Sequence, residues 1–218
     1  MTVSSARPLL RGYLHAGAAV VAALGGTYLV VLSSGDQPRQ LSMLVYGVSL
    51  TLLFAVSAHY HLHTWAPARR AILRRIDHAN IFVLIAATYT PLAFNLLSGW
   101  WRVGILGAVW GGALVGVGAA IASVQLRRGA RAGLYVAMGW IALAALGQIS
   151  AALPWPAIGL LITGGALYSV GALLYARRWP DPWPRVFGYH EVFHLLTVAA
   201  ALAFYVVVLV YVLPAARP

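Results

Sequence analysis

The histidines near the carboxyl-terminal end of the chain are spaced for metal binding. His190 and His194 stand four positions apart, which places both imidazoles on one face of a helix, as a chelating pair requires. His61 can supply a third nitrogen, and Ser57 shares its helix face at the same spacing. Three neutral ligands with one open position are typical of a catalytic zinc site, where bound water is acidic, with a pKa near ~7. The pattern predicts such a site.

Other polar residues suggest what a bound water could do. Asp77 is the carboxylate best placed to accept its proton, and Ser57 could orient the water or donate to a developing oxyanion. Residues 190–194 also match the zinc-protease pattern His-Glu-x-x-His, with Glu191 as the general base. That pattern usually takes its third ligand from further along the chain, and no His, Asp or Glu follows His194. A protease is therefore the less favoured interpretation.

The remaining histidines, taken singly, are more typical of hydrogen bonds between helices than of metal ligands. They are His15, His59, His63 and His78. His59 and His63 are each two positions from His61, so we expect them to point away from its helix face. A bis-histidine haem site is not favoured, because histidines would be expected toward both membrane faces and the sequence places them toward one.

The elements that position these residues are predicted to be membrane helices. Hydrophobic residues make up 61% of the 218-residue chain and charged residues 9%, against roughly 25% charged in a soluble domain. That balance excludes soluble, disordered and fibrous proteins, and the absence of cysteine excludes disulfides and thiolate metal sites. Because lipid offers no partner for backbone polar groups, membrane spans must be helical.

Seven apolar runs are long enough to cross a membrane. They lie at residues 12–32, 41–63, 77–98, 103–124, 133–152, 156–176 and 186–213. We interpret the first run as a retained helix rather than a signal peptide. The sequence thus predicts an all-α, polytopic membrane protein with seven transmembrane helices in a single domain, residues 1–218.

Arginine placement predicts how the chain is oriented. All fifteen basic residues are arginines, and twelve, including Arg7, fall on one side of the predicted spans, against Arg39, Arg102 and Arg217 on the other. The positive-inside rule then predicts a cytoplasmic N-terminus and an outside C-terminus, in the plasma (inner) membrane. The arginines lie between apolar runs and form no single stripe, so we expect membrane lipids and no nucleic acid as partners.

This orientation places the ionisable residues at one depth. The second span ends at the predicted cytoplasmic face, and the first, third and seventh spans begin there. His61, Asp77 and the His190/His194 pair, far apart in sequence, should therefore share the cytoplasmic leaflet with Ser57. Ionisable groups inside a membrane are costly and usually functional, so their common depth favours one site.

Three ordered motifs give the chain a resemblance to a known family. They are Ser57-x-x-x-His61, the stretch 75–82 with its continuation at 87–91, and the stretch 188–194. Together with the seven-helix plan, they resemble the hemolysin III family within the progestin and adipoQ receptor group.

The resemblance implies a seven-helix protein that binds Zn²⁺ near the cytoplasmic side. Its ligands would be His61, His190 and His194, with Asp77 contacting the zinc-bound water and Ser57 beside it. The wider superfamily includes alkaline ceramidases, which suggests hydrolysis of a lipid amide. Receptor relatives can carry Gln at the position of Glu191, which argues against an obligatory base there. His15 also resembles a family position, but we do not assign it to the metal.

These observations favour a zinc-dependent hydrolase of a lipid, possibly an amide, that enters from the cytoplasmic leaflet. One alternative is a non-enzymatic, receptor-like or membrane-homeostasis protein, in which zinc only holds the second, third and seventh helices together. The other alternative is an intramembrane zinc metalloprotease that uses the motif at 190–194.

Overall fold

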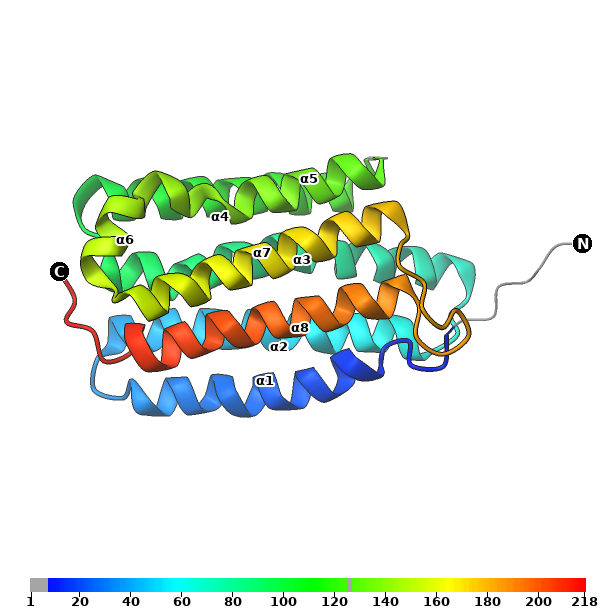
Figure 1. Cartoon of the computed structure of the whole chain (residues 1–218), viewed down its shortest axis with the longest axis horizontal. Helices are drawn as coiled ribbons and strands as arrows, with labels where there is room; N and C mark the ends of the chain where they lie inside the picture. Colours follow the sequence, from blue (N-terminus) through cyan, green and yellow to red (C-terminus); the bar gives the residue numbers. More distant parts are fainter. Residues whose placement is uncertain (1–7, 125–126) are drawn as a thin grey trace, which may run out of the picture.

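The computed structural model describes residues 8–124 and 127–218, and this part of the chain is almost entirely helical (Figure 1). The predicted contribution of Arg7 lies outside the described residues. The helical segments are α1 (Tyr13–Leu32), α2 (Gln37–Leu62), α3 (Pro67–Leu96), α4 (Gly99–Ile121), α5 (Arg128–Gly139), the 3-10 turn η1 (Ile141–Ala145), α6 (Leu146–Ala152), α7 (Trp155–Arg177), α8 (Tyr189–Val207) and the π-helical turn η2 (Val208–Val212). No strand longer than a single bridge occurs among the described residues.

The predicted all-α architecture with seven spans is confirmed. Seven helical stretches are long and apolar enough to cross a membrane, when α5, η1 and α6 are taken as one span. α3 begins at Pro67 rather than at 77, because its arginine-rich first turns continue the helix beyond the apolar run. The cytoplasmic placement of the N-terminus stays a prediction from the arginine distribution.

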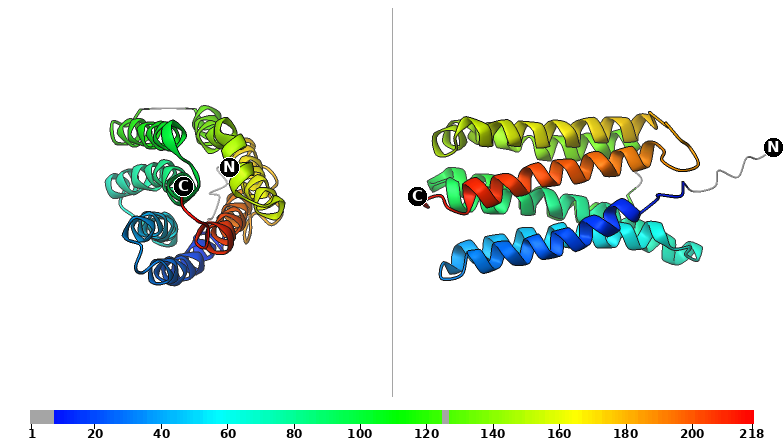
Figure 2. Two further views of the ribbon diagram at one scale, coloured as in Figure 1. Left: turned by 90° about the vertical axis from the view of Figure 1, so that its left-hand side faces the viewer. Right: turned by 60° about the horizontal axis from the view of Figure 1, so that its bottom comes forward.

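The spans are arranged in a ring, as the end-on view in Figure 2 shows. Around it, α1 packs on α2, α2 on α3 and α3 on α4, while α5 packs on α7, α7 on α8 and α8 on α1. α1 crosses α2 closely at two glycines, where a Cβ on Gly47 would lie 2.7 Å from the Gly26 Cα. α1 thus bridges α2 and α8, the two helices that carry the predicted metal ligands.

The fifth span is broken where the sequence predicts a continuous helix. α5 ends at Gly139, and the backbone passes through η1 before α6. Backbone groups released inside a membrane need new partners, and Tyr89 of α3 supplies one on each side of the break. Its hydroxyl donates to the Gly139 carbonyl at 2.6 Å and accepts from the Ala142 N–H at 2.9 Å.

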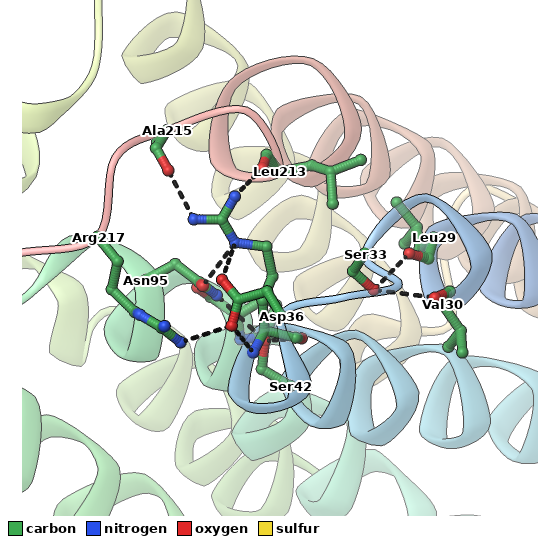
Figure 3. Close-up of polar contacts among 11 residues, drawn as sticks. Leu29, Val30, Ser33, Asp36, Ser42, Asn95, Leu213, Ala215 and Arg217 are labelled. Atoms are coloured by element: carbon green, nitrogen blue, oxygen red, sulfur yellow. Dashed lines mark hydrogen bonds and ion pairs between the residues drawn. The ribbon is translucent and has the colours of Figure 1, made fainter.

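A polar network fastens the end of the chain to α2 and α3 (Figure 3). The Arg39 guanidinium donates to the carbonyl oxygens of Leu213 and Ala215, the latter at 2.7 Å, and to Asn95 Oδ1 at 3.3 Å. Asp36 pairs with Arg217 at 3.0 Å. These contacts satisfy backbone carbonyls that have no partner within the last helical turn. The segment that follows η2 turns inward across the ring (Figure 2).

We predict that Arg39→Met destabilises the protein. The substitution removes the donors to the Leu213 and Ala215 carbonyls, and we expect a loss of about 1–3 kcal/mol in unfolding free energy. Thermal unfolding in detergent measures it. Arg217→Met is the control, because it removes one partly exposed ion pair worth less than about 1 kcal/mol. Equal losses of unfolding free energy in the two variants would contradict the stabilising role assigned to Arg39.

Candidate metal centre

Three imidazoles converge at the end of the bundle where α2 ends and α8 begins, which we call the histidine end. His61 comes from the last turn of α2, and His190 and His194 from the first turns of α8. One ring nitrogen of each lies within 4.8 Å of the other two. The structure therefore brings together the three residues that the spacing and the resemblance singled out, and their role as ligands stays a prediction.

The geometry of this trio fits a zinc ion. Zinc–nitrogen bonds of about 2.0–2.1 Å in a tetrahedral site separate two ligand nitrogens by about 3.3 Å. The Nε2 atoms of His61 and His190 are 3.2 Å apart. His194 is buried and the other two are half-buried, so the cluster is shielded while keeping an open side. With three neutral donors, the site matches the ligand set of catalytic zinc centres.

Glu191, the acidic residue of the protease-like motif, is occupied by structural contacts. It is completely buried. One carboxylate oxygen pairs with the Arg11 guanidinium, and the other accepts the Gly188 N–H at 2.8 Å. The second contact closes the first turn of α8, and the three-residue spacing from Gly188 could have indicated it. Nothing in the sequence indicated Arg11 as the partner.

Ser57 and Asp77 meet across the α2–α3 contact. The side chain of Ser57, buried on α2, lies beside the Asp77 carboxylate near the start of the apolar part of α3. Both side chains line the same cavity as His61. Ser57 is thus placed to orient the carboxylate that the sequence predicts as the proton acceptor.

His15 of α1 lies against the cluster in a way that the sequence did not indicate. Its ring stacks on His194 with centroids 3.7 Å apart and an interplanar angle of 9°. The residue is buried, and within 8–124 and 127–218 neither ring nitrogen has a hydrogen-bond partner. The contact between helices that His15 makes is therefore the stack of its ring on the His194 ring of α8.

Of the other three histidines, His78 forms the expected hydrogen bonds between helices. His78 of α3 binds α5, because Arg131 Nη1 lies 2.8 Å from its Nδ1 and the Tyr135 hydroxyl donates to its carbonyl at 3.1 Å. His59 and His63 are exposed, with ring centroids 5.2 Å apart, and both contact the Trp65 ring. They point away from the cluster, as their spacing from His61 predicts.

The cluster opens into a cavity of about 1170 Å³ inside the ring of helices. Its histidine end is polar, with Ser57 and Asp77 beside the three imidazoles. Its remaining walls are mainly apolar and reach Ile105 near the start of α4 and Ile149 in α6, so the cavity extends through much of the bundle. This volume exceeds that of typical small-molecule pockets.

We predict that the double variant His190→Ala/His194→Ala loses bound metal. Wild type purified with zinc should hold about one ion per chain, and the variant close to none, because one imidazole cannot retain it. Elemental analysis measures the ratio. The matched control is His59→Ala/His63→Ala, which removes an exposed pair at the same spacing and should keep full occupancy. Full zinc content in the first variant would show that the ion binds elsewhere.

The chain is similar to known proteins over most of its length. The family described as "Haemolysin-III related" matches residues 3–205. The chain is 34% identical to the Hemolysin-3 homolog of Bacillus subtilis (strain 168), over 78% of this chain and 76% of the relative. It is 32% identical to Hemolysin-3 of Bacillus cereus, over 84% and 80%. It is also 34% identical to Heptahelical transmembrane protein ADIPOR2 of Oryza sativa subsp. japonica, over 76% and 79%. The match covers nearly the whole chain, which therefore belongs to the haemolysin-III related family of multi-pass membrane proteins.

Proposed function

We propose that this chain is a zinc-dependent hydrolase that cleaves an acyl ester or amide bond of a membrane lipid. One observation carries the proposal: the three-histidine cluster forms the polar end of a large apolar cavity within a membrane bundle. The cavity can accommodate an acyl chain, and its polar end presents the groups that hydrolysis requires. The arginine bias supports entry of the lipid from the cytoplasmic leaflet.

The ligand set favours catalysis over a purely structural metal. Structural zinc sites are generally closed by four protein ligands, whereas catalytic sites keep one position open. Within the described part of the chain, Asp77 forms no ion pair. The Ser57 side chain lies beside its carboxylate. A carboxylate held this way beside the cluster remains available as a proton acceptor.

The residues of the chain then divide the chemistry among themselves. Zinc bound by the three imidazoles would supply Lewis-acid polarisation of the acyl carbonyl and a more acidic water. Asp77 accepts the proton of the attacking water and passes it to the leaving oxygen or nitrogen. The water oxygen joins the acyl carbon, the carbon–heteroatom bond breaks, and a carboxylic acid is released. Ser57 keeps Asp77 in orientation, and His15 keeps His194 in place.

The apolar walls support a lipid as substrate. They are built largely from α3 to α7, and α4 contributes small residues, including Gly111 and Gly112. In the membrane these helices face lipid on their outer side, where large apolar residues such as Leu114 are exposed.

The contacts of Glu191 with Arg11 and Gly188 favour a helix-capping role over the base of a protease.

We predict that Asp77→Asn abolishes hydrolysis and leaves the fold and the metal intact. Loss of the proton acceptor should slow turnover about a hundredfold or more, with unchanged zinc content and melting temperature. The measurement is fatty-acid release from a panel of acyl esters and amides in proteoliposomes.

Glu191→Gln is the control for this experiment. It weakens the pair with Arg11 and should lower the melting temperature while sparing most of the turnover. The reverse result, with Glu191→Gln inactive and Asp77→Asn active, would support the protease. Zinc-loaded wild type that releases no fatty acid from any lipid of the panel would support the non-enzymatic alternative.

A further inference from the structure

Arginines line the cavity toward its histidine end, which we call the mouth of the cavity. The basic residues that line the cavity are Arg11, Arg70, Arg74, Arg75, Arg128 and Arg131, and the acidic ones are Asp77 and Asp181. The mouth therefore has an excess of positive charge. Asp77 faces Ser57 and the exposed Asp181 accepts the Tyr189 N–H at 2.9 Å, so both acidic groups have other partners.

Three of these arginines, from two helices, gather around His78. The charges of Arg74 on α3 and of Arg128 and Arg131 on α5 all act on His78. The Arg128 guanidinium carbon lies 5.7 Å from the centre of the Tyr175 ring, and that ring lies 5.5 Å from the ring of His190. One aromatic side chain thus separates a guanidinium group from a predicted metal ligand.

Two of the three guanidinium groups lack a carboxylate. Among the described residues, ion pairs involve Arg11, Arg39 and Arg217, and none involves Arg74 or Arg128. Guanidinium groups bind phosphate and carboxylate in a bidentate manner, and a cleft lined by charge of one sign concentrates ligands of the opposite sign.

The positive-inside rule accounts for the number of arginines at this end and leaves their direction unexplained. Arg69 and Arg127 are just as exposed as their neighbours, yet neither lines the cavity. Arg128, next to Arg127, does line it. The inward-facing subset is therefore placed to contact a ligand in the cavity.

Building on the hydrolase proposed above, we infer that its substrate is an acyl lipid with an anionic head group, a phosphate or a carboxylate. Arg74, Arg128 and Arg131 hold the head group at the mouth, and the acyl chain extends into the apolar part of the cavity. The scissile bond then lies between them, beside His61, His190 and His194. A lipid of the same chain length with a neutral head group lacks this anchor.

Binding of matched lipids in neutral detergent tests the inference without requiring turnover. The pair N-oleoylglycine and N-oleoylethanolamine compares a carboxylate head group with a neutral one among amides. The pair oleoyl lysophosphatidic acid and monooleoylglycerol compares a phosphate head group with a neutral one among esters. We expect the anionic member of at least one pair to bind wild type about tenfold tighter, with a preference that falls as salt is raised. The pair that shows the preference identifies the head-group chemistry.

The variant Arg74→Gln/Arg128→Gln should lose this preference, and the control Arg69→Gln/Arg127→Gln should keep it. Zinc content and melting temperature verify that both variants are folded. Equal binding of anionic and neutral lipids by wild type overturns the inference, even if the first variant fails to fold. Equal loss in both variants also overturns it, because the effect would then come from general surface charge.

The same preparations distinguish this inference from the proposed hydrolase. If the anionic preference depends on Arg74 and Arg128 but no lipid is cleaved, the head-group site stands and the hydrolase is wrong. If neutral lipids are cleaved as fast as anionic ones, and Arg74→Gln/Arg128→Gln has no effect, the hydrolase stands and the inference is wrong.

Discussion

The meeting of His61 with His190 and His194 constrains where three helices begin and end. α2 must end, and α8 must begin, at one level of the bundle, and α1 lies between them. α1 contributes to this junction directly, because His15 stacks on His194, and Arg11, just before the helix, pairs with Glu191. A cluster of polar rings inside an apolar bundle is costly unless its members are satisfied. A bound cation would satisfy the three converging nitrogens at once.

The polarity of the interior changes from one end of the bundle to the other. The histidine end carries the imidazoles, Asp77, Ser57 and the inward-facing arginines, whereas the deeper cavity is lined mainly by aliphatic side chains. At the opposite end, Arg39 and its carbonyl partners fasten the segment that follows η2. This gradient matches an amphiphile held with its polar group at the histidine end, and it relates the fold to the proposed chemistry on lipids.

Local features of the sequence were sufficient to predict the spans and the histidine trio. Span length depends on runs of apolar residues, and the pairing of His190 with His194 depends only on helical periodicity. The pairing with His61 required the additional step of placing helix ends at a common depth. The break after Gly139 had no such signal, since the residues around it are as apolar as a continuous helix would need. It depends on the hydroxyl of Tyr89, which arrives from another helix.

The side-chain contacts around the site could not be predicted from the sequence either, because they too depend on contacts between different helices. The stacking of His15 on His194 and the pairing of Arg11 with Glu191 depend on how α1 packs against α8. The cavity, and the difference between Arg127 and Arg128 in facing it, depend on the closure of the whole ring.

Zinc K-edge X-ray absorption of the purified, zinc-loaded protein tests the central claim most directly. The account predicts three imidazole nitrogens at about 2.0–2.1 Å and one further light ligand, with the multiple-scattering features of histidine. A spectrum dominated by oxygen ligands, or one that fits a single imidazole, would contradict it.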